Sequence, residues 1–554
     1  MKHLFYGIFF LVLCIQAQGQ MATRVVYDQF ENGELKSEAA TTLIYQNGVM
    51  TLSEPSDKIL YFSDFNQAAN VTLIKNEDAW YMERTPFDSL SAPEFLPDTA
   101  TIAGNLCKKA QFMAFSNTLE VWYTEDLVAA GCPYRNYLPT KQALVLKITV
   151  NGNSSLIARR IEGVQLDNPI FYPASMAAEV DGPEFESLKI RSRYEVVPVF
   201  DHQVVNFDPS LDRPSFETSN NSNVHRLSNG TVVLRKIALP NTPFGYVHAH
   251  LTCASKGDAY DRTGSVFMLP DSDNMTLLSA LKDSVNVLPE FTDKRGEHYQ
   301  GISATESYEP AVELMRFFTS FGAGHFNTIR PISMYDWAHR AEYNQEVTAL
   351  IPHQDSLWIG VFIGNYDKGG HEINLELRFY PPFESESAGR QVLLPLVNTV
   401  NVLEMSGQNY GKLFRTDTLR VSFEIPEGWA QGQMLFTTTG HGGWGEGDEF
   451  VPRKNTLLID GKPFFEVTPW RTDCGTYREG NPASGNFANG LSSSDLSRSN
   501  WCPGTCTPPF IIDASSLSPG THTLSIAVDQ GEDAGSSFNH WSVSCVLVGE
   551  IGEE

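Results

Sequence analysis

Short runs of alternating apolar and polar residues, closed by Gly, Asn, Asp or Pro, dominate this chain and restrict its fold more than any other feature. Such runs are typical of half-buried strands, and many short strands with turns between them predict sandwiches or barrels. Helical periodicity is scarce, and only Thr276–Val285 and Glu309–Phe318 are predicted as helices. The chain is therefore predicted to be all-β. The clearest strand candidates are Ala143–Val150, Ser155–Glu162, Val232–Lys236, Leu375–Tyr380, Leu419–Phe423 and Thr523–Val528.

Composition divides the 554 residues into a leader and three regions. Residues 1–19 carry an apolar run after Lys2 and end in small residues, which predicts a signal peptide. Residues 20–185 are predicted as a mainly-β N-terminal domain that ends in a stretch rich in proline and acids. Residues 186–385 and 386–554 are predicted as two further β domains, separated after Pro381 and Pro382.

Charge and export limit the partners of this chain. Its 66 acidic and 40 Lys and Arg residues give a formal net charge of −26, which disfavours nucleic acid as a partner. No later stretch is long and apolar enough to span a membrane. We expect a periplasmic or secreted protein that acts as a monomer. A lipid anchor on Cys14 is the weaker alternative, because the bulky Leu13 precedes that cysteine.

Three polar segments could carry chemistry. Residues 257–262, GDAYDR, stand between two predicted strands and place carboxylates beside an arginine and an aromatic ring. Residues 439–450 interleave five glycines with acids and Trp444, and glycine lets a backbone approach a ligand while tryptophan stacks on sugars. Residues 492–504, SSSDLSRSNWCPG, form a long loop that a disulfide from Cys474 could brace. Taken singly, each segment could also be a structural turn or loop.

Together, these segments resemble the peptide-N-glycosidase F family, bacterial enzymes that release asparagine-linked glycans. The resemblance covers residues 187–554. It implies two eight-stranded jelly-roll sandwiches side by side, with the active site in the cleft between them. A longer relative with a bowl-like N-terminal domain matches the layout, and residues 107–125 also resemble small exported domains named for a GLPGLI motif.

The resemblance assigns roles to ten residues. It implies that Arg262 contacts the glycan, that Arg498 is a site arginine and that Trp501 forms an aromatic wall. A third carboxylate and a tryptophan of the family are replaced near Gly364 and Asn365, which predicts tolerance of a 3-linked fucose on the innermost GlcNAc. The implied catalytic residues are Asp261 and Glu449, and the implied substrate-binding residues are Arg262, Arg498, Trp501, Asp258, Trp444, Phe450, Gly364 and Asn365.

The predicted activity is hydrolysis of the amide bond between asparagine and GlcNAc in N-linked glycoproteins, without a metal or other cofactor. Asp261 would activate water, and Glu449 would assist the leaving amine. Two alternatives stay open. A glycan-binding protein without catalysis is suggested by the missing third carboxylate. A copper-dependent monooxygenase of similar architecture is suggested by His248 and His250, which face the same way on a strand.

Disulfides are plausible in an exported chain. Of eight cysteines, Cys14 lies in the signal peptide, which leaves seven. The loop that matches the family implies the pair Cys474–Cys502. The remaining cysteines give the predicted pairs Cys107–Cys132 and Cys506–Cys545, with Cys253 free.

Overall fold

The chain forms two compact units, Met1–Arg193 and Tyr194–Glu554, here named the N-terminal and C-terminal units. In the described residues of this computed structural model, no helix is long and apolar enough to cross a membrane. The predicted signal peptide lies outside the described residues. The structure describes residues 20–551 except 54–57, 77, 212–223, 271, 335, 383–389, 410–411, 444–446, 489 and 534–537.

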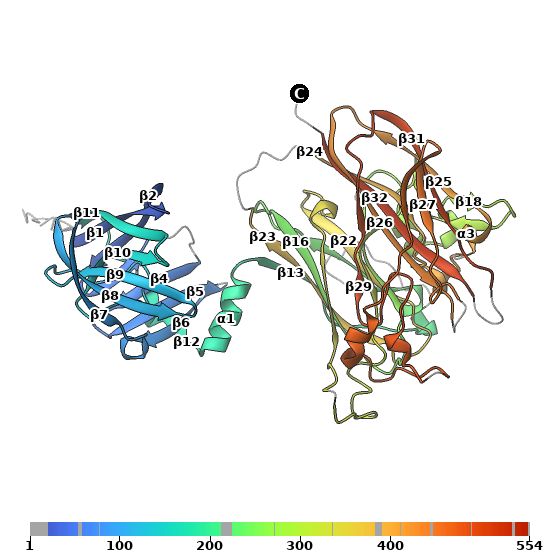
Figure 1. Ribbon diagram of the computed structural model, residues 1–554. Helices are drawn as coiled ribbons and strands as arrows, with labels where there is room; N and C mark the ends of the chain where they lie inside the picture. The colour runs from blue at the N-terminus through green and yellow to red at the C-terminus, as the bar shows by residue number, and fades with distance from the viewer. Residues whose placement is uncertain are drawn as a thin grey trace, which may run out of the picture. The chain divides into compact units, whose positions relative to one another are not determined.

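The N-terminal unit is a single twelve-stranded sheet (Figure 1). Its strands are β1 (Gln20–Glu31), β2 (Glu34–Gln46), β3 (Val49–Leu52), β4 (Ile59–Asp64), β5 (Ala69–Asn76), β6 (Ala79–Pro86), β7 (Glu94–Ile102), β8 (Asn105–Ala114), β9 (Asn117–Thr124), β10 (Leu144–Val150), β11 (Ser154–Leu166) and β12 (Ala177–Glu179). They run in the order β12-β6-β5-β4-β3-β2-β1-β11-β10-β9-β8-β7. The main core packs on one face, where the buried Tyr27 hydroxyl donates to the carbonyl of Val145 at 2.5 Å.

The stretch that the sequence suggested as a border begins a helix, α1 (Gly182–Arg191). The Asp181 side chain accepts a hydrogen bond from the Glu184 amide, and Pro183 stands in the first turn, so both residues start a helix well. The two compact units divide after this helix, between Arg193 and Tyr194. The suggested border at residues 185–186 therefore lies inside α1.

The first sandwich of the C-terminal unit packs two sheets around one apolar core. One sheet has β13 (Glu195–Val205), β23 (His371–Tyr380), β16 (Tyr246–Ser255) and β21 (Ala341–Glu346), in that order. The other has β14 (His225–Leu227), β15 (Val232–Ala238), β22 (Ser356–Ile363), β17 (Thr263–Leu269), β20 (Val312–Phe318) and β29 (Cys506–Thr507), in that order. Burial alternates strictly along β23, as the sequence predicted. A small hairpin, β18 (Glu290–Thr292) and β19 (His298–Gln300), is separate.

The second sandwich lies beside the first and has its own core (Figure 1). One sheet has β24 (Arg390–Asn398), β32 (His540–Ile551), β26 (Trp429–His441) and β30 (Phe510–Asp513), in that order. The other has β25 (Leu419–Ile425), β31 (Gly520–Val528), β27 (Asn455–Ile459) and β28 (Lys462–Val467), in that order. Short helices α2 (Leu277–Lys282) and α3 (Leu413–Thr416) complete the unit. The predicted all-β, two-sandwich fold is confirmed.

One of the two predicted helices is wrong. Residues Glu309–Phe318 contain β20, and all seven residues of this strand are buried. One face of β20 meets the first core and the other faces the second sandwich, so the strand shows no alternation that could distinguish it from a helix. The other predicted helix, Thr276–Val285, is confirmed in part by α2, which Thr276 caps.

A buried ion pair joins the two sandwiches. Arg316 of β20 binds Glu313 through Nε and Nη2, both at 2.6 Å. Its Nη1 donates to the second sandwich, to Thr439 Oγ1 at 2.9 Å and the Ser542 carbonyl at 3.0 Å. The hydroxyl of Ser544, also in the second sandwich, donates to Glu313 at 2.6 Å. Charges this deeply buried have to be paired and hydrogen-bonded, so the network fixes how the sandwiches meet.

We predict that Arg316→Met lowers the free energy of unfolding of the protein by about 3–5 kcal/mol, because it leaves the Glu313 carboxylate buried without its cation. The measurement is denaturant-induced unfolding. Lys454→Met is the matched control, since Lys454 and Glu466 form an exposed pair 2.6 Å apart, and we expect a loss of about 1 kcal/mol or less. Equal losses in the two variants would contradict a structural role for the buried pair.

Candidate active site

Three loops bring charged side chains together at one end of the C-terminal unit. Asp261 lies between β16 and β17, Glu449 lies between β26 and β27, and Arg498 lies in the long segment between β28 and β29. Nη1 of Arg498 is 3.1 Å from Asp261 Oδ2 and also hydrogen-bonds Glu449 Oε1. A carboxylate from each sandwich therefore meets the same guanidinium.

The Arg498 side chain is completely buried, whereas the two carboxylates keep 18% and 16% of their side-chain surface exposed. Its Nη2 donates to the carbonyl of Ser493 at 2.7 Å and to the hydroxyl at 3.1 Å. The guanidinium lies over the rings of Trp501, at 4.4 Å, and Phe450, at 5.0 Å. These contacts fix the buried cation, whereas both carboxylates keep part of their surface in contact with solvent.

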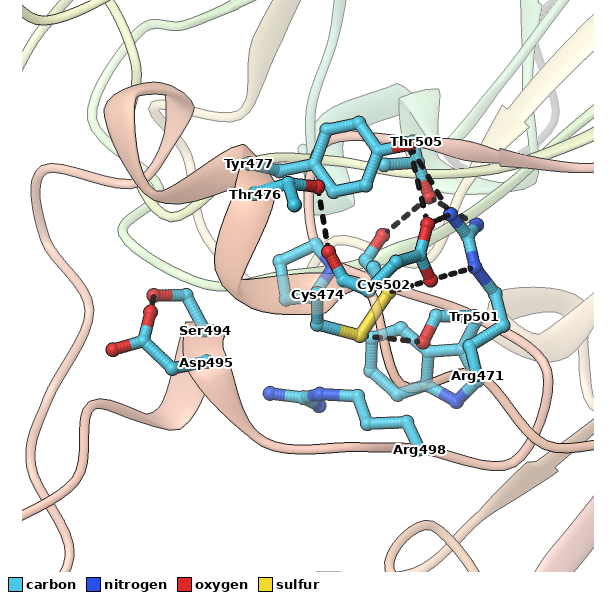
Figure 2. The surroundings of a disulfide bond; sticks show 12 residues. Arg471, Cys474, Thr476, Tyr477, Ser494, Asp495, Arg498, Trp501, Cys502 and Thr505 are labelled. Carbon is cyan, nitrogen blue, oxygen red and sulfur yellow. Dashed lines mark hydrogen bonds and ion pairs between the residues drawn. A yellow bond between two sulfur atoms is a disulfide. The ribbon is translucent and has the colours of Figure 1, made fainter.

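The segment that carries Arg498 is attached to both sandwiches. The Cys474–Cys502 disulfide closes it, as predicted, and Figure 2 shows Arg498 next to this bond. Beyond the disulfide, β29 pairs with β20 of the first sandwich. On the other side, the amide of Ser499 donates to the carbonyl of Glu449 at 2.9 Å. The long loop is therefore an ordered part of the site.

The glycine-rich loop that presents Glu449 is held by the buried carboxylate of Asp448. This carboxylate accepts hydrogen bonds from Arg453 Nε at 2.7 Å, Trp541 Nε1 at 2.9 Å and the Gly531 amide at 2.9 Å. A Cβ at Gly447 would collide with the carbonyl of Gly442, so glycine is required for this close approach. Trp444 of the same loop lies outside the described residues.

Arg262 is clamped beside Asp261. Asp258, which is fully buried, accepts from Arg262 Nε at 2.8 Å and from Nη2 at 3.2 Å. The guanidinium lies between the rings of Tyr260, at 4.9 Å, and Tyr366, at 5.3 Å. Asp258 is thus enclosed and cannot contact a substrate, which corrects its predicted role. It orients Arg262 instead.

Two other predicted contacts differ in the structure. Trp501 is only 3% exposed, stacks on Phe318 at 4.2 Å and donates from Nε1 to the Gly440 carbonyl, so it supports Arg498 and is not an open wall. Asn365 is fully buried, and its amide donates to the Val205 carbonyl at 3.1 Å. The resemblance to the family implied both contacts, and a match between sequences does not reveal the direction of a side chain.

Tyr366 occupies the neighbourhood that the sequence left open. Gly364 is partly exposed there, and the adjacent Tyr366 side chain is 56% exposed with its ring on Arg262. Its hydroxyl donates to Glu404, a residue of another segment that no motif indicated. Tolerance of a 3-linked fucose on the innermost GlcNAc stays a prediction.

Burial raises the pKa of both acids. The pKa of Glu449 is raised from 4.5 to about 7, because loss of hydration and then the nearby Asp261 raise it by more than Arg498 lowers it. Burial also raises the pKa of Asp261, while Arg498 and then Arg262 lower it. Two acids that share one cation titrate as a pair, and a pKa of about 7 lets Glu449 hold a proton beside Asp261 over part of the neutral range.

Two of the three predicted disulfides are wrong. Cys107, Cys132, Cys506 and Cys545 are free, as is Cys253, whose free state was predicted. Cys545 lies in the core of the second sandwich, whereas Cys506 packs against the core of the first. Cys107 and Cys132 are separately enclosed in the N-terminal core, where burial raises the Cys132 pKa to about 12.

The histidines that suggested copper lie on β16. His250 contacts the amide oxygen of Asn344 at 2.8 Å, and the His248 ring meets Tyr380. Within the described part of the chain, no group of three or more His, Cys, Asp or Glu side chains is placed to hold a metal ion.

Comparison with known proteins finds a matching family model in each of the three regions that the sequence predicted after the signal peptide. Residues 196–379 match the family described as Peptide-N-glycosidase F, N terminal, and residues 409–548 match Peptide-N-glycosidase F, C terminal. Residues 25–181 match the N-glycanase peptide, N-terminal domain. No curated protein sequence gives a significant match.

Two solved structures of PNGF-II are similar to this chain over nearly its whole length. The structures in the P21 and C2 space groups are each 35% identical to it and cover 96% of it, with TM-scores of 0.83 and 0.79. This chain covers 100% and 99% of theirs. A structure of PNGase F from Flavobacterium meningosepticum is 14% identical over 64% of this chain and 96% of its own, with a TM-score of 0.43.

The raised pKa of Glu449 predicts a pH-dependent stability. Between pH 4.5 and about 7, the folded protein keeps a proton that the unfolded chain releases, so this group lowers stability as the pH rises through that window. The Glu449→Gln variant has no carboxyl at this position, so it lacks this fall in stability with rising pH. We expect wild type to lose on the order of 1–3 kcal/mol relative to this variant from pH 4.5 to 7, measured by denaturant unfolding. A difference independent of pH would contradict the raised pKa.

Proposed function

This chain belongs to the peptide-N-glycosidase F family, in its longer type with an added N-terminal domain, and on that premise we propose that it is a peptide-N4-(N-acetyl-β-glucosaminyl)asparagine amidase. The proposed reaction hydrolyses the amide bond between asparagine and the innermost GlcNAc and gives aspartate and a glycosylamine. The observation that carries it is the meeting of Asp261 and Glu449 on Arg498. A lectin needs no such pair of acids.

The proposed base is Asp261. An amide is a poor electrophile, so the attacking water has to be positioned while its proton is accepted. Asp261 is held by Arg498, lies next to Arg262 in sequence and keeps part of its carboxylate exposed. Burial raises the pKa of Asp261, but Arg498 and Arg262 favour its ionised form, so it can accept a proton while Glu449 holds one.

The proposed acid is Glu449. With a pKa near 7 it carries a proton over part of the neutral range and can donate it to the departing amine. Its distance from Asp261 is set by one shared Arg498 nitrogen, so base and acid stay on the same side of the cation. Arg262, with Tyr260 61% exposed beside it, is proposed to hold the first sugar.

The proposed partners are N-linked glycoproteins and glycopeptides. Export to the periplasm or the medium, by cleavage of residues 1–19, is part of the same proposal, since such substrates are met outside the cytoplasm. The acidic net charge of −26 fits neutral or basic polypeptides better than phosphate-rich ones.

We predict that Asp261→Asn abolishes glycan release and that Glu449→Gln lowers kcat by about 10²–10⁴-fold, the usual effect of one acid–base group. The measurement is mass spectrometry of an N-glycopeptide, in which release converts Asn to Asp. Asp495→Asn, an exposed carboxylate on the Arg498 segment, is the matched control and should retain activity. Near-normal turnover by Asp261→Asn would contradict the assigned base.

We predict that a strong chelator leaves activity unchanged, because the proposed acid and base are carboxylates that act with arginines. The test compares glycopeptide release before and after EDTA treatment, with metal analysis of the same sample. Loss of turnover with EDTA and its recovery with copper would instead support a role for His248 and His250.

A further inference from the structure

Tyr366 and Glu404 connect two distant segments beside the proposed site. Tyr366 belongs to the loop between β22 and β23, and Glu404 begins a short 3-10 helix, Glu404–Ser406, in the segment that follows β24 of the second sandwich. The hydroxyl of Tyr366 donates to Glu404 Oε1. The ring of the same Tyr366 side chain lies against the Arg262 guanidinium.

The Glu404 carboxylate lies close to Gly364. A Cβ built on Gly364 would lie 3.9 Å from Glu404 Oε2, at ordinary van der Waals distance, with Phe362 Cζ at 3.6 Å and the Thr263 carbonyl at 3.7 Å. The helix that carries Glu404 is fixed on the first sandwich. Ser406 Oγ lies 3.0 Å from Ser228 Oγ, and Leu403 is buried in an apolar cluster with first-sandwich residues such as Leu234 and Phe267.

Arg262 is therefore held from two directions. The buried Asp258 carboxylate binds its guanidinium edge, and the Tyr366 ring covers one of its faces. The hydroxyl of the same Tyr366 side chain donates to Glu404. Because Arg262 directly follows Asp261, a shift of Tyr366 would change the surface next to the proposed base.

We propose that Glu404 is a positioning residue for a saccharide subsite next to Asp261, where it holds Tyr366 in place on Arg262. Tyr260 and Tyr366, which are 61% and 56% exposed, flank the guanidinium and offer ring faces to a pyranose of the N-acetylhexosamine class. This inference rests on the proposed function. It adds a residue from the segment between β24 and β25 to the binding of a sugar by the first sandwich.

The test measures kcat and KM on an N-glycopeptide for Tyr366→Phe, Glu404→Ala and the double variant. Each single variant should raise KM about 3- to 10-fold with kcat within about twofold, because one hydrogen bond in a partly exposed position is lost. The double variant should be no worse than either single one, since both remove the same contact. Glu404→Gln keeps an acceptor oxygen and should lose less than Glu404→Ala.

Glu306→Ala, an exposed glutamate of the same unit, is the matched control and should behave as wild type. The affinity for the disaccharide di-N-acetylchitobiose is measured on the same proteins by calorimetry. It should fall about 3- to 10-fold in Tyr366→Phe and Glu404→Ala. Unchanged KM and disaccharide affinity in both variants, or equal losses in Glu404→Ala and Glu404→Gln, would overturn the inference. If wild type released no glycan, the proposed function would fail, and the disaccharide affinities alone would decide the subsite.

Discussion

The site is divided between two sandwiches, so it depends on the buried network that keeps them in register. Apolar contacts alone allow two sheets to slide, whereas hydrogen bonds to a buried charge have narrow geometry. Arg316 and Glu313 sit on the same strand of the first sandwich and reach Thr439, Ser542 and Ser544 of the second. Thr439 lies on the strand that leads into the Glu449 loop. Burying this pair costs the free energy of hydration of two charges. In exchange, the pair fixes a single arrangement of the two sandwiches at their interface.

The charges of the site follow from that fixed interface. A single buried cation, Arg498, stands between two carboxylates that are themselves mostly out of water, so it stabilises one negative charge more readily than two. The pKa of Glu449 is therefore raised to about 7, and the proposed function uses this carboxyl as the acid and Asp261 as the base. Because the donors of Arg498 are fixed by Ser493 and by the rings of Phe450 and Trp501, little reorganisation is needed during a reaction.

Much of the fold could be predicted because most strands have one face in a core and one in solvent, and β23 and β25 alternate accordingly. Prediction failed at β20, where burial on both faces removes the alternation. The three site segments can be recognised because each combines glycine with acidic and aromatic residues. The direction in which side chains point could not be predicted, and Asp258, Asn365 and Trp501 are buried residues that support the site from inside. Glu404 could not be found, since its position depends on how a distant segment packs.

The path of the chain explains why the site needs the whole C-terminal unit. After leaving β28 of the second sandwich, the chain passes through the disulfide-closed segment, adds β29 to the sheet of the first sandwich and returns as β30. Arg498 is thus tied to Glu449 through Ser499 and to the first sandwich through β29. Neither sandwich alone can hold this cation in place. A displacement of either sandwich would separate Arg498 from one of its carboxylates, which makes correct packing of the two sandwiches a condition for the paired acids to exist.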